Sequence, residues 1–260
     1  MTELDPRTIW GSAASAENYE RGRPGPAPAL VAEVCDALGV RPGSRVLDLA
    51  AGTGKLTRVL ASCADDIVAV EPSAAMRAGL REQVPGVRVR PGTAEAIPLP
   101  DASVDAVLVS DAFHWFEPGA ALAEMRRVLR EGGGAGVFVT LPVWDGSASW
   151  VAGLGELLGA HRIALPAANR AEDLAWRAPL GAPPGFAPSQ HAEAVVVHSM
   201  SRDDIAAQIT SWSFVTMLPA GERADFRAAL AELLDAPTAG GTRPLELPHR
   251  TEAYWMVRAA

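Results

Sequence analysis

The chain is poor in lysine, cysteine and aromatic residues, and it has no excess of positive charge. Of its 260 residues 6% are aromatic, and the formal net charge is −8. Among 23 basic residues the one lysine is Lys55. The sequence holds no basic tract and no basic stripe interleaved with aromatic residues, the patterns that are typical of nucleic-acid binding. Nucleic acid is therefore not an expected partner.

Long apolar runs are also missing. None reaches 18 residues, so neither a membrane-spanning helix nor a membrane partner is expected. The first residues, 1–5, show neither the positive start nor the apolar stretch of a secretory signal, which makes the cytoplasm the expected compartment. The two cysteines, Cys35 and Cys63, fall in segments that we expect to be helical. We interpret them as small buried residues in a reducing compartment rather than a disulfide pair.

Metal ligation has little support in the sequence. Five histidines, at positions 114, 161, 191, 198 and 249, show no spacing of three or four residues, and no Cys-x-x-Cys motif occurs, so no metal site is expected. The apolar content of 48% and the charged content of 21% are ordinary for a globular protein. The frequent alanine, arginine, glycine and proline indicate a bacterial source.

The most informative segment that is present runs from Val46 to Lys55. An apolar run with Asp48 leads into Ala50, Gly52 and Gly54, and residues 56–61 then have the pattern of a helix. Glycines permit positive φ and close approach of a ligand to the backbone. The unpaired N–H groups of a helix N-terminus favour an anionic ligand group. The segment therefore predicts a strand, a loop and a helix that together bind a nucleotide-like ligand.

Two common nucleotide-binding motifs do not fit this spacing. A dinucleotide fingerprint needs a third glycine where Thr57 stands, and a P-loop needs a glycine where Leu49 stands. What remains resembles motif I of the class I S-adenosylmethionine (SAM) methyltransferases, an acidic residue followed by G-x-G-x-G. Ala50 replaces the first glycine of that motif. The resemblance implies that Asp48, Ala50, Gly52 and Gly54 help to bind SAM.

A second acidic residue stands where a ribose ligand is expected. Glu71 ends the short apolar run 67–70, nineteen residues after Gly52. In dinucleotide folds an acid about 20 residues beyond the glycine loop accepts hydrogen bonds from the ribose hydroxyls. We expect Glu71 and the adjoining Pro72 in the cofactor site. Ser73 then caps a helix in which Met76 lies either against the adenine or in the core.

Two further segments fit the same family. Thr93, Ala94 and Glu95 resemble the "GDAEALPF" segment that edges the adenine, and we carry over Ala94 and Glu95 as cofactor residues. The segment 104–109, apolar apart from Asp105, is typical of a central parallel strand, and Ser110, Asp111, His114 and Trp115 follow it. Because ligands bind beyond the carboxyl ends of such strands, Ser110 is expected at the cofactor, and a second substrate should lie here.

The run Phe113-His114-Trp115-Phe116 is similar to the type 11 methyltransferase domain, in the branch of trans-aconitate methyltransferase-like proteins. Tyr19 and Arg23 lie in a segment that resembles the Y-x-x-x-R-P of that branch, which implies that both contact the cofactor. The resemblance is specific over 44–142, weaker over 19–40 and 195–258, and absent over 143–190.

The expected fold is α/β, a Rossmann-like class I methyltransferase fold with a mostly parallel seven-stranded sheet, helices on both faces and a helical lid. We expect a single methyltransferase domain over 1–260. It would comprise an N-terminal cap (1–43), a SAM-binding core (44–142), a substrate-side insertion that forms the lid (143–190), and the last part of the sheet (191–260). The strands expected there are 195–198 and 254–258. Oligomeric state cannot be read from the sequence.

The resemblance implies methyl transfer from SAM, with S-adenosylhomocysteine as product, to a small-molecule acceptor. We expect an oxygen acceptor, either a hydroxyl or a carboxylate. A hydroxyl needs a base, for which His114 is the candidate, although this residue could instead orient the acceptor. Trp115 and Trp144 are candidates for the substrate side. The alternative functions are a non-methylating reaction such as a cyclisation, or a binding partner without turnover.

Overall fold

The computed structural model describes residues 10–143, 149–161, 174–238 and 244–259. Its sheet has seven strands in the order β3-β2-β1-β4-β5-β7-β6. The neighbours pair in parallel except that β7 runs antiparallel to both β5 and β6. The strands are β1 (Arg45–Leu49), β2 (Asp66–Val70), β3 (Arg88–Arg90), β4 (Val104–Ser110), β5 (Leu129–Pro142), β6 (Gln190–Met200) and β7 (Leu245–Val257). The strand order reverses between β1 and β4, which is where α/β sheets bind ligands.

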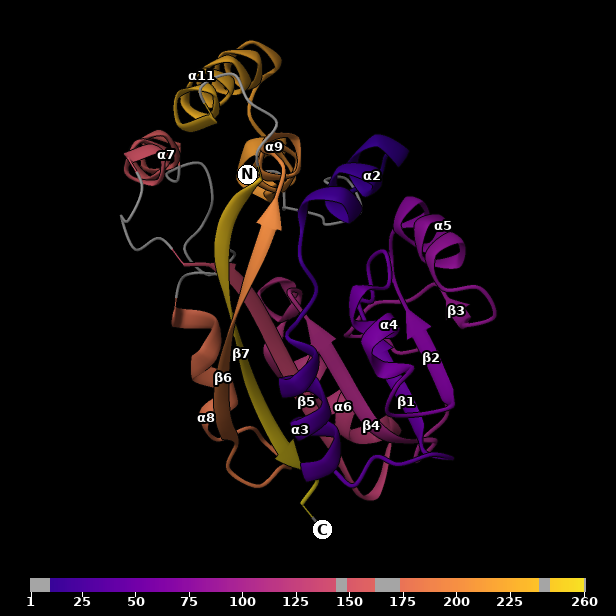
Figure 1. Ribbon diagram of the computed structural model, residues 1–260. Helices are drawn as coiled ribbons and strands as arrows, with labels where there is room; N and C mark the ends of the chain where they lie inside the picture. Colours follow the sequence, from indigo (N-terminus) through magenta and orange to yellow (C-terminus); the bar gives the residue numbers. More distant parts are fainter. Residues whose placement is uncertain (1–9, 144–148, 162–173, 239–243, 260) are drawn as a thin grey trace.

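Helices cover both faces of the sheet, as expected (Figure 1). Along each central strand both faces are apolar, so alternate residues enter two separate cores. On one face α3 and α4 pack against Val46 and Leu108, and on the other α6, η4 and α8 pack against Leu47 and Val107. The elements of these layers are α3 (Pro28–Ala37), α4 (Lys55–Leu60), α5 (Ala74–Gln83), η1 (Phe113–Trp115), α6 (Pro118–Val128), η4 (Leu174–Arg177) and α8 (Ala178–Gly181).

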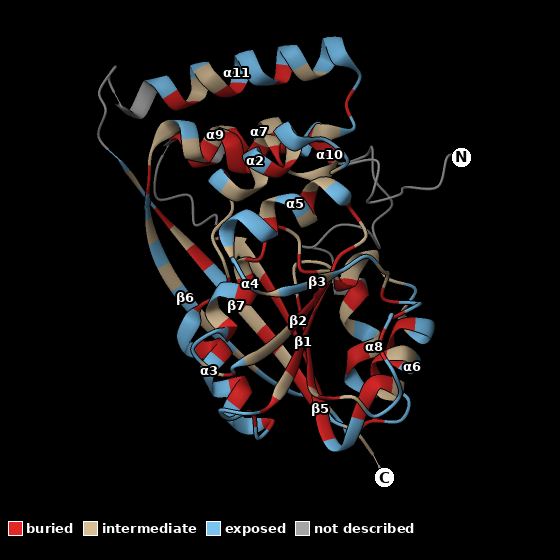
Figure 2. Ribbon diagram, turned by 90° about the vertical axis from the view of Figure 1, so that its right-hand side faces the viewer, coloured by how far each residue is buried: buried red, intermediate tan, exposed pale blue. Residues whose placement is uncertain are grey.

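A second group of helices lies beyond the ends of the parallel strands (Figure 1). It comprises α2 (Ala13–Gly22), α7 (Ser149–Gly159), α9 (Arg202–Thr210), α10 (Ser213–Thr216) and α11 (Ala220–Thr238). Helices α7, α9, α10 and α11 share an apolar core of their own, which includes Leu154, Ile209 and Phe226. Figure 2 shows its buried residues facing inward and the outer side of α11 exposed. We call these five helices the cap.

The structure corrects two expectations about the cap. The lid was expected from 143–190. Of the residues in that range that the structure describes, α7 belongs to the cap, whereas η4 and α8 cover the sheet with Trp176 and Leu180. Helix α2 comes from the N-terminal segment, where no helix was expected. Helices α9, α10 and α11 come from 202–238, between β6 and β7, where the sequence pattern predicts helices at 203–212 and 221–234. The last two strands are also longer than the predicted 195–198 and 254–258. Helix α3 begins at Pro28, and Gly39, shortly after its end, has positive φ.

Candidate functional site

The glycine loop between β1 and α4 has an alternating backbone. Ala50, Gly52 and Gly54 have φ values of 57°, 57° and 90°, all in the left-handed region. A Cβ at Gly54 would lie 3.1 Å from side-chain atoms of both Leu80 and Val84. An alanine in this conformation costs about 1–2 kcal/mol relative to glycine, and such strain is typical of functional sites. The loop therefore keeps the shape of the G-x-G-x-G motif although Ala50 replaces its first glycine.

Asp48 anchors the loop to the helix that follows it. Its side chain is buried in β1, and Oδ2 accepts a 2.5 Å hydrogen bond from the Thr57 hydroxyl. Burial raises the pKa of the carboxyl group from 3.8 to about 7. Among the described residues no group hydrogen-bonds the other oxygen, Oδ1, which is also buried. A buried acceptor without a partner in a ligand-binding fold marks a position for a donor from a ligand.

Glu71 closes the other side of the loop from the end of β2. Its Oε2 accepts from the Gly52 N–H at 3.0 Å, and its Oε1 accepts from the Ser73 N–H at 2.7 Å. Burial raises the pKa of this carboxyl group, and the two hydrogen bonds oppose that rise. Each carboxylate oxygen can accept a second hydrogen bond. Glu71 therefore orders the glycine loop and still has acceptor capacity for a vicinal diol.

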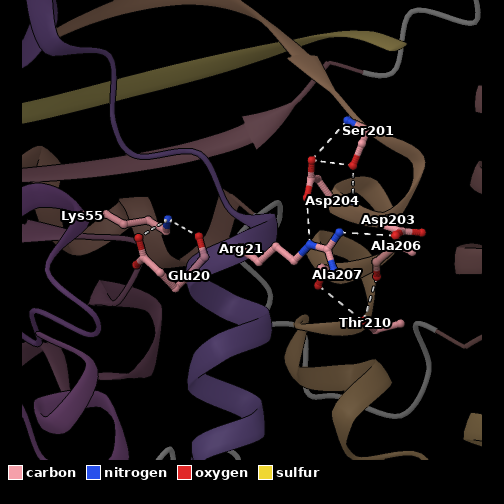
Figure 3. Close-up of polar contacts among 9 residues, drawn as sticks. All are labelled: Glu20, Arg21, Lys55, Ser201, Asp203, Asp204, Ala206, Ala207 and Thr210. Carbon is pink, nitrogen blue, oxygen red and sulfur yellow. Dashed lines mark hydrogen bonds and ion pairs between the residues drawn. The ribbon is translucent and has the colours of Figure 1, made fainter. Parts of the chain in front are cut away.

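Helix α2 lies across the glycine loop. The Tyr19 ring is the nearest group to a Cβ built on Gly52, at 3.8 Å. Glu20 Oε2 accepts from the Thr53 hydroxyl at 2.5 Å, and Oε1 accepts from Arg58 at 2.7 Å. The ammonium group of Lys55 donates to the Glu20 carbonyl at 2.7 Å (Figure 3). The one lysine of the chain thus holds α2 against the loop.

The residues that follow Glu20 hold α2 against α9, another helix of the cap. Arg21 Nε donates to Asp204 at 2.9 Å on α9, the side opposite to Lys55 (Figure 3). Gly22 lies so close to α9 that a Cβ would be 2.0 Å from the backbone nitrogen of Gln208. Arg23 donates to the Ser211 hydroxyl at 3.1 Å, and its guanidinium lies 5.0 Å from the centre of the Tyr19 ring. Helix α2 therefore connects the glycine loop with the other helices of the cap.

The end of β4 faces the same region. Asp111 has a φ of 55°, its Oδ1 accepts from the Thr140 N–H at 2.7 Å, and burial raises its pKa. The positive charge of Arg23 influences both Asp111 and His114. Burial first, and Arg23 second, lower the pKa of His114 to about 3. The imidazole is therefore neutral near pH 7.

Aromatic rings adjoin these polar groups. The Trp115 ring meets Trp10 edge-on at 5.4 Å between centroids, and Trp10 meets Tyr19 at 6.4 Å. Aromatic faces can attract a cation such as a sulfonium. The sequence predicted Tyr19 and Trp115 here, whereas Trp10 was not predicted. Trp144 lies outside the described residues.

The structure places most of the predicted cofactor residues around the glycine loop or at neighbouring strand ends. Ser110 donates to Asp111 at 3.3 Å, and the Pro72 carbonyl accepts from Arg77. Met76 and Ala94 are buried. Glu95 is exposed, and its carboxylate accepts from the Glu117 N–H at 3.0 Å rather than pointing into the loop. Asp111 lies at the strand end where the sequence predicts the second substrate, although no role was predicted for its carboxylate. Glu20 was not predicted at the site, and no pattern in the sequence indicates it.

Two absences hold for the parts of the chain that the structure describes. There, no group of three or more His, Cys, Asp or Glu residues could hold a metal ion. Within the same ranges, no helix is both long and apolar enough to cross a membrane.

Comparisons with known proteins agree with this geometry. Residues 47–136 match the family model of a methyltransferase domain. The chain is 48% identical over 153 residues to an uncharacterized methyltransferase of Mycobacterium bovis, a match that spans 58% of each chain. It is 31% identical over 243 residues to a methyltransferase-like protein of Schizosaccharomyces pombe, covering 91% of both chains.

The chain belongs to the class I SAM-dependent methyltransferases. A solved structure assigned to a type II methyltransferase of Anaeromyxobacter dehalogenans shares the methyltransferase fold, with a TM-score of 0.72. That structure is 26% identical in sequence, and the match covers 90% of this chain and 97% of the other. The family and the Rossmann-like fold expected from the sequence are thereby confirmed. The comparisons do not single out the trans-aconitate methyltransferase-like branch, and they do not favour a non-methylating function.

Proposed function

We propose that this methyltransferase transfers a methyl group from SAM to a carboxylate oxygen of a small molecule. The observation that carries the proposal is a neutral imidazole, His114 after β4, whose pKa is lowered by burial and by the positive charge of Arg23 at the end of α2. The cytoplasmic location and the bacterial source remain predictions of the sequence.

The residues of the glycine loop fit SAM. Glu71 has acceptor capacity for the two ribose hydroxyls, and the orphaned Oδ1 of Asp48 is suited to the ammonium group of the methionine part. The left-handed turn at Gly52 brings the loop backbone under Tyr19. When bound, SAM supplies a methyl group that is already electrophilic. What this chain has to add is alignment of the acceptor, which can lower a barrier by about 7–11 kcal/mol.

The charges at the end of β4 favour a carboxylate acceptor over a hydroxyl. A hydroxyl must lose its proton, and an imidazole whose pKa is about 3 is a weak base near pH 7. A carboxylate needs no base. His114 can donate a hydrogen bond to it, and Arg23 can balance its charge. We therefore assign His114 to orienting the acceptor rather than to proton removal.

Arg23 is suited to the acceptor more than to the cofactor. No carboxylate of the described residues lies within ion-pair distance of its guanidinium, which stacks on Tyr19 and is held by Ser211. Its charge influences Asp111 and His114 at the end of β4, and also Tyr19 and Lys55 beside the glycine loop, but not Asp48 or Glu71. This differs from the sequence-based expectation, which gave Arg23 to the cofactor.

The experiment is a transfer assay with methyl-labelled SAM and a panel of small carboxylic acids and phenols. A methyl ester releases volatile methanol in alkali, whereas a methyl ether does not. We expect label in an alkali-labile product from at least one acid. His114→Asn should retain most of kcat, and Arg23→Gln should raise KM for the acid at least tenfold. The exposed Arg81→Gln variant is the control. Label only in alkali-stable products would contradict the proposal.

A further inference from the structure

A pocket lies outside the site described so far, among α2, α9 and α11. Its volume is about 370 Å³, which is within the range of small-molecule sites. It is lined by Asn18, Arg21, Arg202, Asp203, Ala206, Ala207, Thr210, Arg227, Leu230, Ala231 and Leu234. All of these residues belong to the cap.

The lining combines an apolar surface with positive charge. Ala206 of α9 and Ala231 of α11 supply the accessible apolar part, whereas Leu230 and Leu234 are buried in the apolar core of the cap. Three arginines but only one acidic residue line the pocket, in a chain whose net charge is −8. Such a surface suits a ligand with an anionic group and a short apolar part.

The arginines differ in how far their charges are already balanced. Arg202 pairs with Asp235, and Arg21 donates through Nε and Nη2 to Asp204 and Asp203. Arg21 remains half exposed. Arg227 is exposed and pairs with no carboxylate of the described residues. An anion in the pocket would therefore have two partners, the guanidinium of Arg227, unpaired among the described residues, and the half-exposed guanidinium of Arg21.

We propose that this pocket binds a small amphiphilic carboxylate, which regulates the cofactor site through α2. The anionic group lies at Arg21 and Arg227, and the short apolar part lies on Ala206 and Ala231. Arg21 is next in sequence to Glu20, which closes α2 over the glycine loop from the opposite side of the helix (Figure 3). A ligand that competes with Asp203 and Asp204 for Arg21 changes the position of α2. Because α2 carries Tyr19 and Glu20 at the glycine loop, this movement changes the affinity of the site for its cofactor.

Octanoate is the probe for a calorimetric titration of the full chain without other ligands. We expect wild type and the control Arg81→Gln to bind it alike, Arg227→Gln to bind at least tenfold more weakly, and Ala231→Trp, which fills the pocket, not to bind. Inorganic phosphate and octanamide test the charge and the apolar part alone, and each should bind at least tenfold more weakly than octanoate. Equal binding of octanoate to wild type and Ala231→Trp would overturn the site. Binding of phosphate as tight as that of octanoate would overturn the ligand class.

Regulation is tested by titrating S-adenosylhomocysteine with and without saturating octanoate. The affinity for S-adenosylhomocysteine should change at least threefold in wild type and not in Ala231→Trp. The affinity for octanoate should change by the same factor when S-adenosylhomocysteine is present, because coupling is reciprocal. Octanoate binding without any change in that affinity would overturn the regulatory role. The titration of octanoate alone does not depend on methyl transfer, so failure of the proposed function would be seen separately.

Discussion

Substitution of Gly22 by alanine should loosen the packing of α2 against α9 and weaken cofactor binding. The new methyl carbon would lie 2.0 Å from the nitrogen of Gln208 and 2.4 Å from the carbonyl carbon of Ala207. Both are backbone atoms of α9, so no side chain can rotate away. Overpacking costs about 1–3 kcal/mol, and a clash with backbone belongs at the upper end of that range. The higher helix propensity of alanine returns at most about 1 kcal/mol.

The net loss of about 2 kcal/mol should appear mainly as detachment of α2. This helix buries few of its own residues, Ala16 and Gly22 among them, so it can separate without unfolding the sheet. A loss of that size lowers the docked population about 30-fold relative to the detached one. Because α2 carries Tyr19 and Glu20 onto the glycine loop, the affinity for S-adenosylhomocysteine should fall with it.

The assay combines hydrogen exchange of the α2 amides with calorimetric titration of S-adenosylhomocysteine. Gly155→Ala in α7 is the matched control, since nothing lies within 4 Å of its added Cβ. That control should be neutral or stabilising by up to about 1 kcal/mol and should leave affinity unchanged. If Gly22→Ala exchanged its α2 amides at the wild-type rate and bound S-adenosylhomocysteine equally well, the claim that docking of α2 on α9 supports the cofactor site would be wrong.

Four other predictions follow from single residues. Glu71→Gln should weaken SAM binding by about 1–3 kcal/mol, because an amide cannot replace both acceptor oxygens; an unchanged Kd by calorimetry would remove Glu71 from the ribose site. The dependence of kcat on pH should show no ionisation of His114 between pH 5 and 8. An increase of kcat with an apparent pKa near 6.5 that is absent in His114→Asn would show that His114 acts as a base. Asp48 has a folded-state pKa of about 7 against 3.8 unfolded, so stability should fall as pH rises from about 4 to about 7; Asp48→Asn should flatten that slope in denaturant titrations, and a parallel slope would refute it. Ala50→Gly should raise the stability by up to about 1 kcal/mol by relieving its positive φ, and a lower Tm would contradict the strain argument.

The core of the fold could be predicted from the sequence because its signals are local. The apolar strand before Asp48, the glycines after it and the acid at Glu71 each follow from a few adjacent residues. The mostly parallel sheet then follows from the alternation of strands and helices, whereas its strand order was not predicted. The position of Asp111 was visible for the same reason, because the residues after an apolar strand lie at the sheet edge.

The pattern predicts helices at the places of α9 and α11, but α2 and the assembly of the cap could not be predicted, because they depend on contacts that are distant in the sequence. Helix α2 buries few of its own residues, and its place is set by Gly22 against α9, nearly 190 residues later. The contacts between Glu20 and Lys55 likewise depend on how α2 docks, and no spacing in the sequence predicts them. The segment 143–190 contains α7, which belongs to the cap, and η4 and α8, which pack on the sheet, and its composition does not distinguish the two.

The most direct test of the account is calorimetric titration of the ligand-free protein with SAM and, separately, with S-adenosylhomocysteine. We predict that one molecule of each binds per chain with a micromolar Kd, and that Gly22→Ala and Glu71→Gln weaken both. A folded, ligand-free sample that releases no heat with either compound would contradict the assignment of the glycine loop, Glu71 and α2 as the cofactor site.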